Sequence, residues 1–302
     1  MKVLLASSSL VAEPSLRALL SSRHEVVGGL TTPDRPRGRG REITENEFAQ
    51  LLSVENIPVY KPQSSAELIE ILTKVKPDVV ITISYGRLIK LDALRLPKFG
   101  WLNVHFSLLP RWRGASPIQR AIAAGDTSTG VTVFKIEEGL DTGPIYVQRE
   151  YVMRGNEQTA ELLDLLSHEA TTSLIESLQM IEDGVEPTPQ SESGVTLAPK
   201  ITKEEGRIDW HFTNEEIERQ IRALSPWPSA WSLFSGQRIA IISAKLSSFD
   251  LRTGEILSAD GIHVGCGKDS LQIVEIKPEG KRTMLASEWL RGLRHGTEMG
   301  FE

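Results

Sequence analysis

The spacing of apolar residues along the first two thirds of the chain predicts strands that alternate with helices. Apolar or β-branched runs predict the strands, and apolar residues three or four apart predict the helices between them. Strands are expected at 2–6, 25–30, 57–60, 79–84, 102–105, 131–135 and 145–151, and helices at 13–22, 46–55, 66–75, 118–124 and 159–181. Such repeated strand–helix–strand units predict an α/β fold, a doubly wound and mostly parallel Rossmann-like sheet.

The pattern of the chain changes after residue 183. Residues 184–203 are rich in Pro, Ser, Thr and Gly, which predicts a linker. Short strands with turn residues between them are then expected at 230–234, 237–247, 254–258, 261–265 and 270–277, with helices at 214–223 and 288–294. This spacing predicts a small β-barrel. The expected organisation is a first domain at 1–183, the linker at 184–203 and a second domain at 204–302.

Composition narrows the class of protein. A chain of 302 residues with 40% hydrophobic and 25% charged residues is typical of a globular protein of two domains. The single Cys266 excludes an internal disulfide and fits a reducing compartment, so a cytoplasmic location is expected. The six His lack metal-ligand spacing, so no metal is expected. Glu13 and Pro14 interrupt the apolar start, which favours a buried first strand over a signal peptide, and no stretch is long enough to cross a membrane.

Charge is unevenly distributed, although the net charge is −6. Residues 61–120 carry 10 Lys and Arg against 4 Asp and Glu, whereas residues 121–200 carry 4 against 14. Arg35, Arg37, Arg39 and Arg41 lie in the segment PDRPRGRGRE, whose Pro and Gly residues exclude a regular helix. Guanidinium groups on such a loop suit phosphate contacts and the end of an RNA helix. A basic loop that is simply solvated is the alternative interpretation.

Three polar residues form the strongest candidate for chemistry. Asn103 and His105 lie two residues apart at the end of an apolar strand, so their side chains project on one face. Asp141 follows one supersecondary unit later between Gly139 and Gly143. The amide and the imidazole can stabilise an oxyanion and the carboxylate can orient the imidazole, which suits acyl transfer to an amine. Taken singly, the three could equally be a capping amide, a packed ring and a loop carboxylate.

Seven segments of the chain carry a further signal: TPDRP at 32–36, GRG at 38–40, NVH at 103–105, SLLP at 107–110, RWRGA at 111–115, GLDTG at 139–143 and RALSPW at 222–227. Together these seven segments resemble the folate-dependent formyltransferase family. They occur in order between residues 32 and 227, and the flanking segments are most similar to the branch that acts on initiator methionyl-tRNA. No GxGxxG motif is present, which disfavours a nicotinamide or flavin enzyme.

The resemblance implies transfer of the formyl group of 10-formyltetrahydrofolate, without a metal, to the α-amino group of methionyl-initiator tRNA. It implies an OB-like barrel that binds tRNA as the second domain, and a monomer is expected. The catalytic residues would be Asn103, His105 and Asp141. Folate would lie against Ser107, Leu108, Leu109, Pro110, Tyr85, Gly86 and Leu88, and tRNA against Arg35, Arg37, Arg39 and Arg41, with Arg39 at the stem end.

Three positions depart from the family pattern, and two alternative functions stay open. Phe106 stands where a small residue or Pro is usual, Ser7-Ser8-Ser9 replaces glycine-threonine-proline, and the proline late in the Tyr85 loop is absent. A relative in the superfamily that formylates a ribonucleotide is expected to end near residue 200, whereas this chain has a further 100 residues. A relative that formylates an amino sugar would leave PDRPRGRGRE without a purpose. If the chain were a folate- or RNA-binding module without catalysis, the set of Asn103, His105 and Asp141 would have no purpose.

Overall fold

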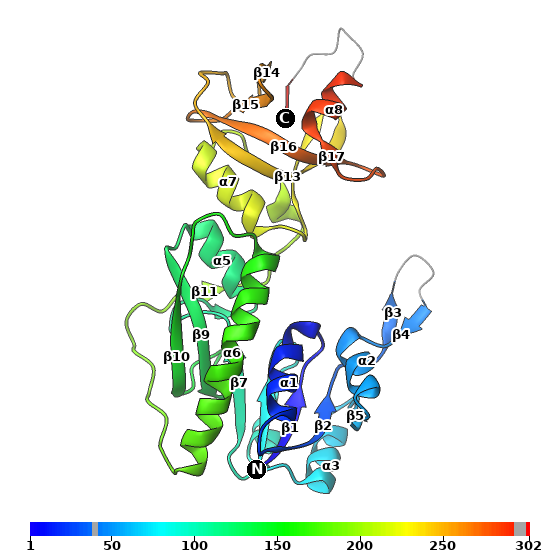
Figure 1. Cartoon of the computed structure of the whole chain (residues 1–302), viewed down its shortest axis with the longest axis vertical. Coiled ribbons are helices and arrows are strands. Elements are labelled where there is room, and N and C mark those ends of the chain that lie inside the picture. Colours follow the sequence, from blue (N-terminus) through cyan, green and yellow to red (C-terminus); the bar gives the residue numbers. More distant parts are fainter. Residues whose placement is uncertain (38–41, 293–299) are drawn as a thin grey trace. The chain divides into compact units, whose positions relative to one another are not determined.

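The computed structural model describes residues 1–37, 42–292 and 300–302, which divide into two compact units (Figure 1). Unit 1 comprises Met1–Pro117, Ser128–Val152 and Leu163–Ala198, and unit 2 comprises Ile118–Thr127, Met153–Leu162 and Pro199–Glu302. The chain therefore enters unit 2 after residue 117 and again after residue 152, as well as after residue 198.

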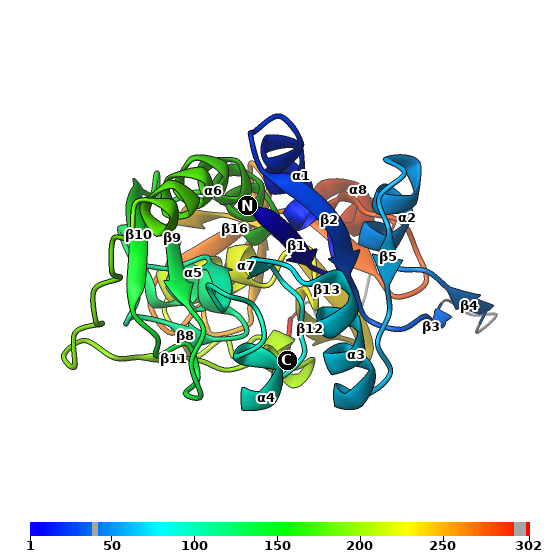
Figure 2. The same cartoon turned by 90° about the horizontal axis from the view of Figure 1, so that it is seen from below.

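A seven-stranded sheet in the order β10-β9-β7-β6-β1-β2-β5 forms the centre of unit 1. Its parallel strands are β1 (Lys2–Ala6), β2 (Glu25–Leu30), β5 (Val59–Tyr60), β6 (Val79–Thr82) and β7 (Trp101–His105), and β9 (Ser128–Lys135) and β10 (Ile145–Val152) are antiparallel at one edge. Helices α1 (Glu13–Leu20) and α6 (Thr159–Glu182) cover one face and α3 (Ser65–Val75) covers the other (Figure 2). The predicted fold class is confirmed.

Burial explains why the central strands read as continuous apolar runs. Residues 3–6 of β1 and 79–81 of β6 are fully buried, since helices cover both faces of a parallel sheet. The strand order reverses between β1 and β6, and ligands of such sheets bind at the carboxyl ends of the strands near this point. Here the loops after β1 and β6 are joined by a hydrogen bond from Ser8 Oγ to the Ser84 carbonyl at 3.0 Å.

Several short elements of unit 1 were not expected from the sequence. The basic segment contains a hairpin of β3 (Arg35–Arg37) and β4 (Glu42–Thr44), and the predicted linker contains β11 (Leu197–Ala198), which pairs in parallel with β8 (Arg113–Gly114). Each strand has only two or three residues, too few for a periodic pattern. The remaining elements of unit 1 are a 3-10 turn at Leu10–Ala12, α2 (Glu47–Val54) and α4 (Leu91–Leu94), and helix α5 (Pro117–Ala124) leads into unit 2.

Unit 2 is built on an antiparallel sheet that packs around one apolar core. The strand order is β12 (Ala230–Phe234), β13 (Gln237–Ser247), β16 (Ser270–Pro278), β15 (Ile262–Gly265) and β14 (Ile256–Ser258), and β17 (Met284–Leu285) pairs with β16. Irregular pairing near Ser243 lets β13 bend. Helix α7 (Asn214–Ala223) begins at a Thr213–Glu216 capping box and buries Ile217 and Ile221 in the core.

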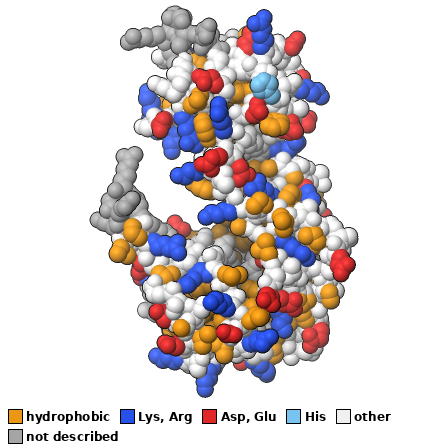
Figure 3. Space-filling view, turned by 180° about the vertical axis from the view of Figure 1, so that it is seen from behind, with side chains coloured by type: hydrophobic (Ala, Val, Ile, Leu, Met, Phe, Trp, Pro, Cys, Tyr) orange, Lys and Arg blue, Asp and Glu red, His pale blue; other side chains and the backbone are white. Residues whose placement is uncertain are grey.

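Two short helical elements flank the sheet of unit 2 in sequence. A 3-10 turn at Glu204–Gly206 precedes α7, and α8 (Ala286–Arg291) lies at the position of the helix expected at 288–294, of which residues 293 and 294 lie outside the described residues. Basic, acidic and hydrophobic side chains are interspersed over the face of the molecule in Figure 3. In the described part of the chain, the apolar stretches of the helices are too short to span a bilayer.

Candidate active site

Asn103 lies near the carboxyl end of β7, where the neighbouring strand β6 anchors it. Thr82 on β6 pairs with Asn103 in the strand register, and its hydroxyl donates a hydrogen bond to Asn103 Oδ1 at 2.8 Å. Because Oδ1 is held in this way, the Nδ2–H group of the amide is the part that can donate to a ligand. Thr82 is a residue that sequence analysis did not identify, since only the register of two strands distant in sequence brings it to the site.

His105 is buried two residues further along β7, and its ring orientation is fixed by the backbone. Its Nε2 lies 2.8 Å from the carbonyl oxygen of Trp112. A carbonyl can only accept, so Nε2 carries the hydrogen in the neutral ring and Nδ1 carries the lone pair. Burial lowers the pKa of His105 below the ordinary 6.5, and the Asp141 carboxylate and the Trp112 carbonyl oppose this only in part. The ring is therefore a neutral base near neutral pH.

Asp141 reaches the same place from the loop between β9 and β10. Its Oδ2 accepts a hydrogen bond from the Gly114 N–H at 2.8 Å and lies 3.8 Å from His105 Nδ1. The backbone of Asp141 is left-handed, with φ of 50°. The loop passes so close to β9 that a Cβ at Gly143 would lie 1.7 Å from the Lys135 carbonyl oxygen, so only glycine fits there. The structure thus brings together the imidazole and the carboxylate that the sequence singled out.

The SLLP loop, residues 107–110, is held by hydrogen bonds from the two antiparallel edge strands. Thr132 Oγ1 on β9 donates to the Ser107 carbonyl at 2.6 Å and accepts from the Leu109 N–H at 3.3 Å. Gln148 Nε2 on β10 donates to the Leu109 carbonyl at 2.9 Å and to Thr132 Oγ1 at 3.0 Å. Leu109 is buried, whereas Leu108 and Pro110 are partly exposed. Thr132 and Gln148 are further residues that sequence analysis missed.

The loop after β6 offers a ligand mainly backbone and one apolar side chain. The Tyr85 side chain is buried in the core under this edge of the sheet, and Gly86 has a φ of 73° that permits a tight turn. Leu88 is 93% exposed, so its side chain is accessible to a ligand. Phe106, one of the departures from the family pattern, has its side chain buried with 6% exposure.

The basic segment is separate from the Asn–His–Asp set in sequence and is anchored at its base. Lys61 bonds to Asp34 at 2.8 Å and to Glu45 at 2.7 Å, one on each side of the β3–β4 hairpin. Arg35 is exposed on β3 and Arg37 ends this strand. Arg39 and Arg41 lie outside the described residues. Within the ranges that are described, no group of three His, Cys, Asp or Glu residues could hold a metal ion.

Replacement of Thr82 by valine is expected to lower kcat for the reaction of this site by about tenfold, since Asn103 loses the hydrogen bond that orients its amide. Valine has the shape of threonine, so packing is kept. Thr82→Ser keeps the hydroxyl and serves as the matched control, with kcat close to wild type. Steady-state kinetics of the three proteins check this, and an unchanged kcat in Thr82→Val would show that Asn103 needs no anchor.

The lowered pKa of His105 predicts a pH-dependent contribution to stability. The unfolded chain binds a proton at His105 below about pH 6.5, whereas the folded chain binds this proton only at a lower pH. The contribution of His105 to the free energy of unfolding is therefore complete above about pH 6.5 and decreases as the pH falls. The difference in unfolding free energy between wild type and His105→Asn should shrink from about pH 7 to about pH 5. Urea unfolding at several pH values measures this, and a constant difference would contradict it. Burial also lowers the pKa of His24, which affects both proteins alike.

Comparison with known proteins agrees with the class of enzyme that the fold and site indicate. The family described as Formyl transferase matches residues 1–178, and the one described as Formyl transferase, C-terminal domain matches residues 200–294. The chain belongs to the formyl transferase family.

Among curated relatives, the methionyl-tRNA formyltransferase of Streptomyces griseus is 39% identical over 99% of this chain and 100% of its own length. The methionyl-tRNA formyltransferase of Magnetococcus marinus is 40% identical over 96% and 94%. The particular protein that this chain resembles throughout is therefore methionyl-tRNA formyltransferase.

Solved structures share the fold at lower identity. HypX from Aquifex aeolicus in complex with tetrahydrofolic acid has a TM-score of 0.70 at 20% identity, and covers 98% of this chain and 48% of HypX. Methionyl-tRNA formyltransferase from Clostridium thermocellum has a TM-score of 0.58 at 19% identity, over 88% of this chain and 100% of that one. At these identities the likeness concerns the fold alone.

Proposed function

We propose that the chain transfers the formyl group of 10-formyltetrahydrofolate to the α-amino group of methionyl-initiator tRNA, giving formylmethionyl-tRNA. The full-length similarity to curated relatives of this activity supports the acceptor, and membership of the formyl transferase family supports the donor. The observation that carries the proposal is the His105–Asp141 pair, with Nδ1 3.8 Å from Oδ2, next to an Asn103 amide whose oxygen is already engaged.

The proposed reaction divides the chemistry among these three side chains. The neutral α-amine attacks the formyl carbon, a carbon–nitrogen bond forms, and the formyl oxygen becomes an oxyanion that Asn103 Nδ2–H stabilises. The attacking nitrogen gives its proton to Nδ1 of His105, the one ring nitrogen with a lone pair. The Asp141 carboxylate stabilises the imidazolium that results. Collapse of the intermediate breaks the bond to the folate nitrogen, which takes up the proton from His105.

The folate is proposed to bind along the carboxyl ends of β6 and β7. Apolar contact and backbone groups would come from the SLLP loop, residues Ser107, Leu108, Leu109 and Pro110. The backbone of Tyr85 and Gly86 would contact the edge of the pterin ring of the folate. Leu88, on the same loop, has an almost fully exposed side chain that a ligand could cover. Burial of that surface by a ligand would be favourable.

The tRNA is proposed to contact the basic segment and unit 2. Arg35, Arg37, Arg39 and Arg41 would bind phosphates, and the domain at 204–302 would add affinity without reacting groups, in line with the match of its sequence to the C-terminal domain of the family. We further propose that the protein acts as a monomer in the cytoplasm.

A comparison of acceptors tests the proposal. The full chain is incubated with 10-formyltetrahydrofolate and, in parallel, with charged initiator tRNA, a nucleotide-linked amino sugar or glycinamide ribonucleotide, and formylated product is measured by mass spectrometry. The proposal requires formylation of the methionyl-tRNA only. Formylation of the amino sugar or the ribonucleotide instead would assign the chain to another branch of the family, and no product with any acceptor would indicate a binding module.

A further inference from the structure

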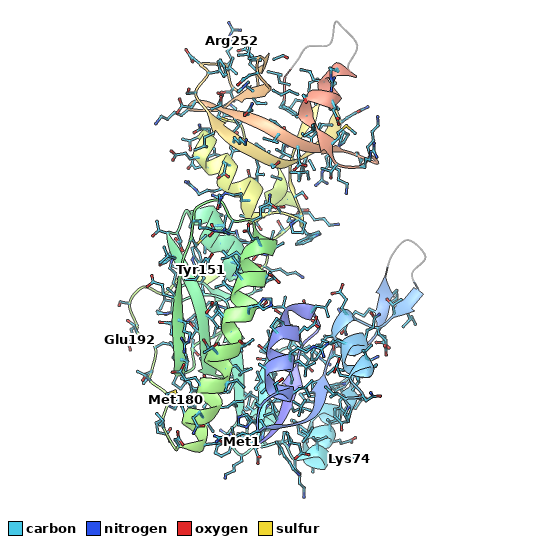
Figure 4. The ribbon with its side chains drawn as sticks, viewed as in Figure 1. Met1, Lys74, Tyr151, Met180, Glu192 and Arg252 are labelled. Atoms are coloured by element: carbon cyan, nitrogen blue, oxygen red, sulfur yellow. The ribbon has the colours of Figure 1, made fainter. Side chains whose placement is uncertain are left out.

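Residues 184–198, here called the strap, were predicted to be part of a linker, and in the structure they belong to unit 1 and bond to its other elements at several points. Thr188 exchanges two backbone hydrogen bonds with Ile145 on β10, at 2.7 and 2.8 Å. At its other end, Leu197–Ala198 forms β11 and pairs with β8. Figure 4 labels Glu192 on the strap between these two attachments. Because the strap is attached at Thr188 and again at Leu197–Ala198, it can restrain the residues that it contacts between these two points.

Gln190 of the strap uses both polar ends of its side chain, one on the Asp141 loop and the other on β8. Its Nε2 donates to the carbonyl oxygens of Asp141 and Gly143, both at 2.8 Å. Its Oε1 accepts from Nε and Nη2 of Arg113 at 3.1 and 2.6 Å. The next residue of β8, Gly114, donates its N–H to the Asp141 carboxylate at 2.8 Å. Asp141 is therefore held by its backbone through Gln190 and by its side chain through β8.

Thr196 of the strap forms hydrogen bonds with the backbone of the segment that orients His105. Its Oγ1 accepts the N–H of Trp112 at 2.8 Å, and its carbonyl accepts the N–H of Arg113 at 2.9 Å. The carbonyl of Trp112 in turn accepts from Nε2 of His105 at 2.8 Å. Trp112 has a left-handed backbone, with φ of 63°, a conformation that needs support from its surroundings.

Gly114 shows how closely the strap lies against β8. A Cβ at this position would lie 2.6 Å from the Ala198 carbonyl oxygen, and the φ of 126° is one that other residues rarely adopt. The residue that bonds to Asp141 is thus one at which the strap leaves no room for a side chain.

We propose that the strap positions the His105–Asp141 pair: Gln190 holds Asp141, and Thr196 holds His105 through Trp112. The effect on rate rests on the proposed function, whereas the effect on the ring of His105 does not. When Gln190 is lost, Asp141 moves away from His105 and no longer raises the pKa of its ring. When the hydroxyl of Thr196 is lost, Trp112 shifts and the Nε2–H form of the ring loses its acceptor.

Two variants of the full chain that keep side-chain size test the proposal, each with a control. Gln190→Met removes the four hydrogen bonds, and Glu192→Gln, at an exposed strap position, is its control. Thr196→Val removes the hydroxyl, and Thr196→Ser keeps it. NMR of ¹⁵N-labelled imidazoles, with His105 assigned by His105→Asn, gives the tautomer and pKa of the ring without any substrate, and kinetics give kcat and KM.

The proposal requires a lower His105 pKa in Gln190→Met and a smaller share of the Nε2–H tautomer in Thr196→Val. It requires kcat to fall by about tenfold to 100-fold in both, with KM for the folate within about twofold. Glu192→Gln and Thr196→Ser should match wild type. Wild-type ring signals and wild-type kcat in both test variants would overturn it. If the ring signals change but wild type itself formylates no methionyl-tRNA, the proposed function fails and the positioning role stands.

Discussion

Replacement of Asn103, His105 or Asp141 by alanine is expected to lower kcat for formyl transfer by about 100- to 1000-fold, with little change in tRNA affinity. In the proposed mechanism each variant removes one group that acts on the reacting atoms. Asn103→Ala would remove the oxyanion donor, His105→Ala the base, and Asp141→Ala the charge that stabilises the imidazolium. Because these groups act mainly in the transition state, kcat and kcat/KM should fall together.

Asp141→Asn separates the charge of this residue from its structural role. Asparagine can still accept the N–H of Gly114, so the loop keeps its anchor, but the attraction to the ring of His105 is lost. Its kcat should be close to that of Asp141→Ala. Glu138→Ala, an exposed carboxylate on the same loop, is the matched control and should behave like wild type. A near-normal kcat in Asp141→Asn would show that its charge has no part in the reaction.

Arg39→Ala is expected to lower kcat/KM for charged initiator tRNA by about ten- to 100-fold, while KM for 10-formyltetrahydrofolate stays unchanged. A guanidinium can stack on a base and bond to phosphate at the same time, and an ammonium cannot do both, so Arg39→Lys should be intermediate. The loss of one phosphate contact should also make the dependence of tRNA binding on salt less steep by about one charge.

Lys74→Ala is the matched control for Arg39→Ala. It removes one exposed positive charge from α3, outside the basic segment, and should leave kcat/KM for the tRNA near wild type (Figure 4). If Arg39→Ala and Lys74→Ala have the same kcat/KM at moderate salt, the basic segment is only a solvated surface.

The sequence predicted best the elements whose apolar pattern is long and regular. The strands 2–6, 25–30, 230–234 and 237–247 and the helix 214–223 have the bounds that were expected, and β6 and β7 differ from the expected strands by one or two residues at one end. Asn103 and His105 could be paired from sequence because a strand repeats every two residues. Each of these predictions depends on residues that are close in the chain.

The sequence could not predict features that depend on contacts between distant segments. Thr82 anchors Asn103 only because β6 and β7 are adjacent in one register. The strap bonds to the rest of unit 1 largely through backbone groups and through the polar side chains of Gln190 and Thr196. Such contacts leave no apolar pattern, so the composition of the strap is that of a linker. The division into units also depends on contacts between distant segments. Helix α6 is continuous, yet its first turn, up to Leu162, belongs to unit 2.

The most direct test of the proposed function is the rate of formylmethionyl-tRNA formation with initiator and with elongator tRNA, both charged with methionine, at saturating 10-formyltetrahydrofolate. The two acceptors present the same amine and the same ester, so any difference comes from recognition of the tRNA. We expect rapid formylation of the initiator tRNA and little of the elongator tRNA. Equal rates with both, or no formylmethionine from either, would contradict it.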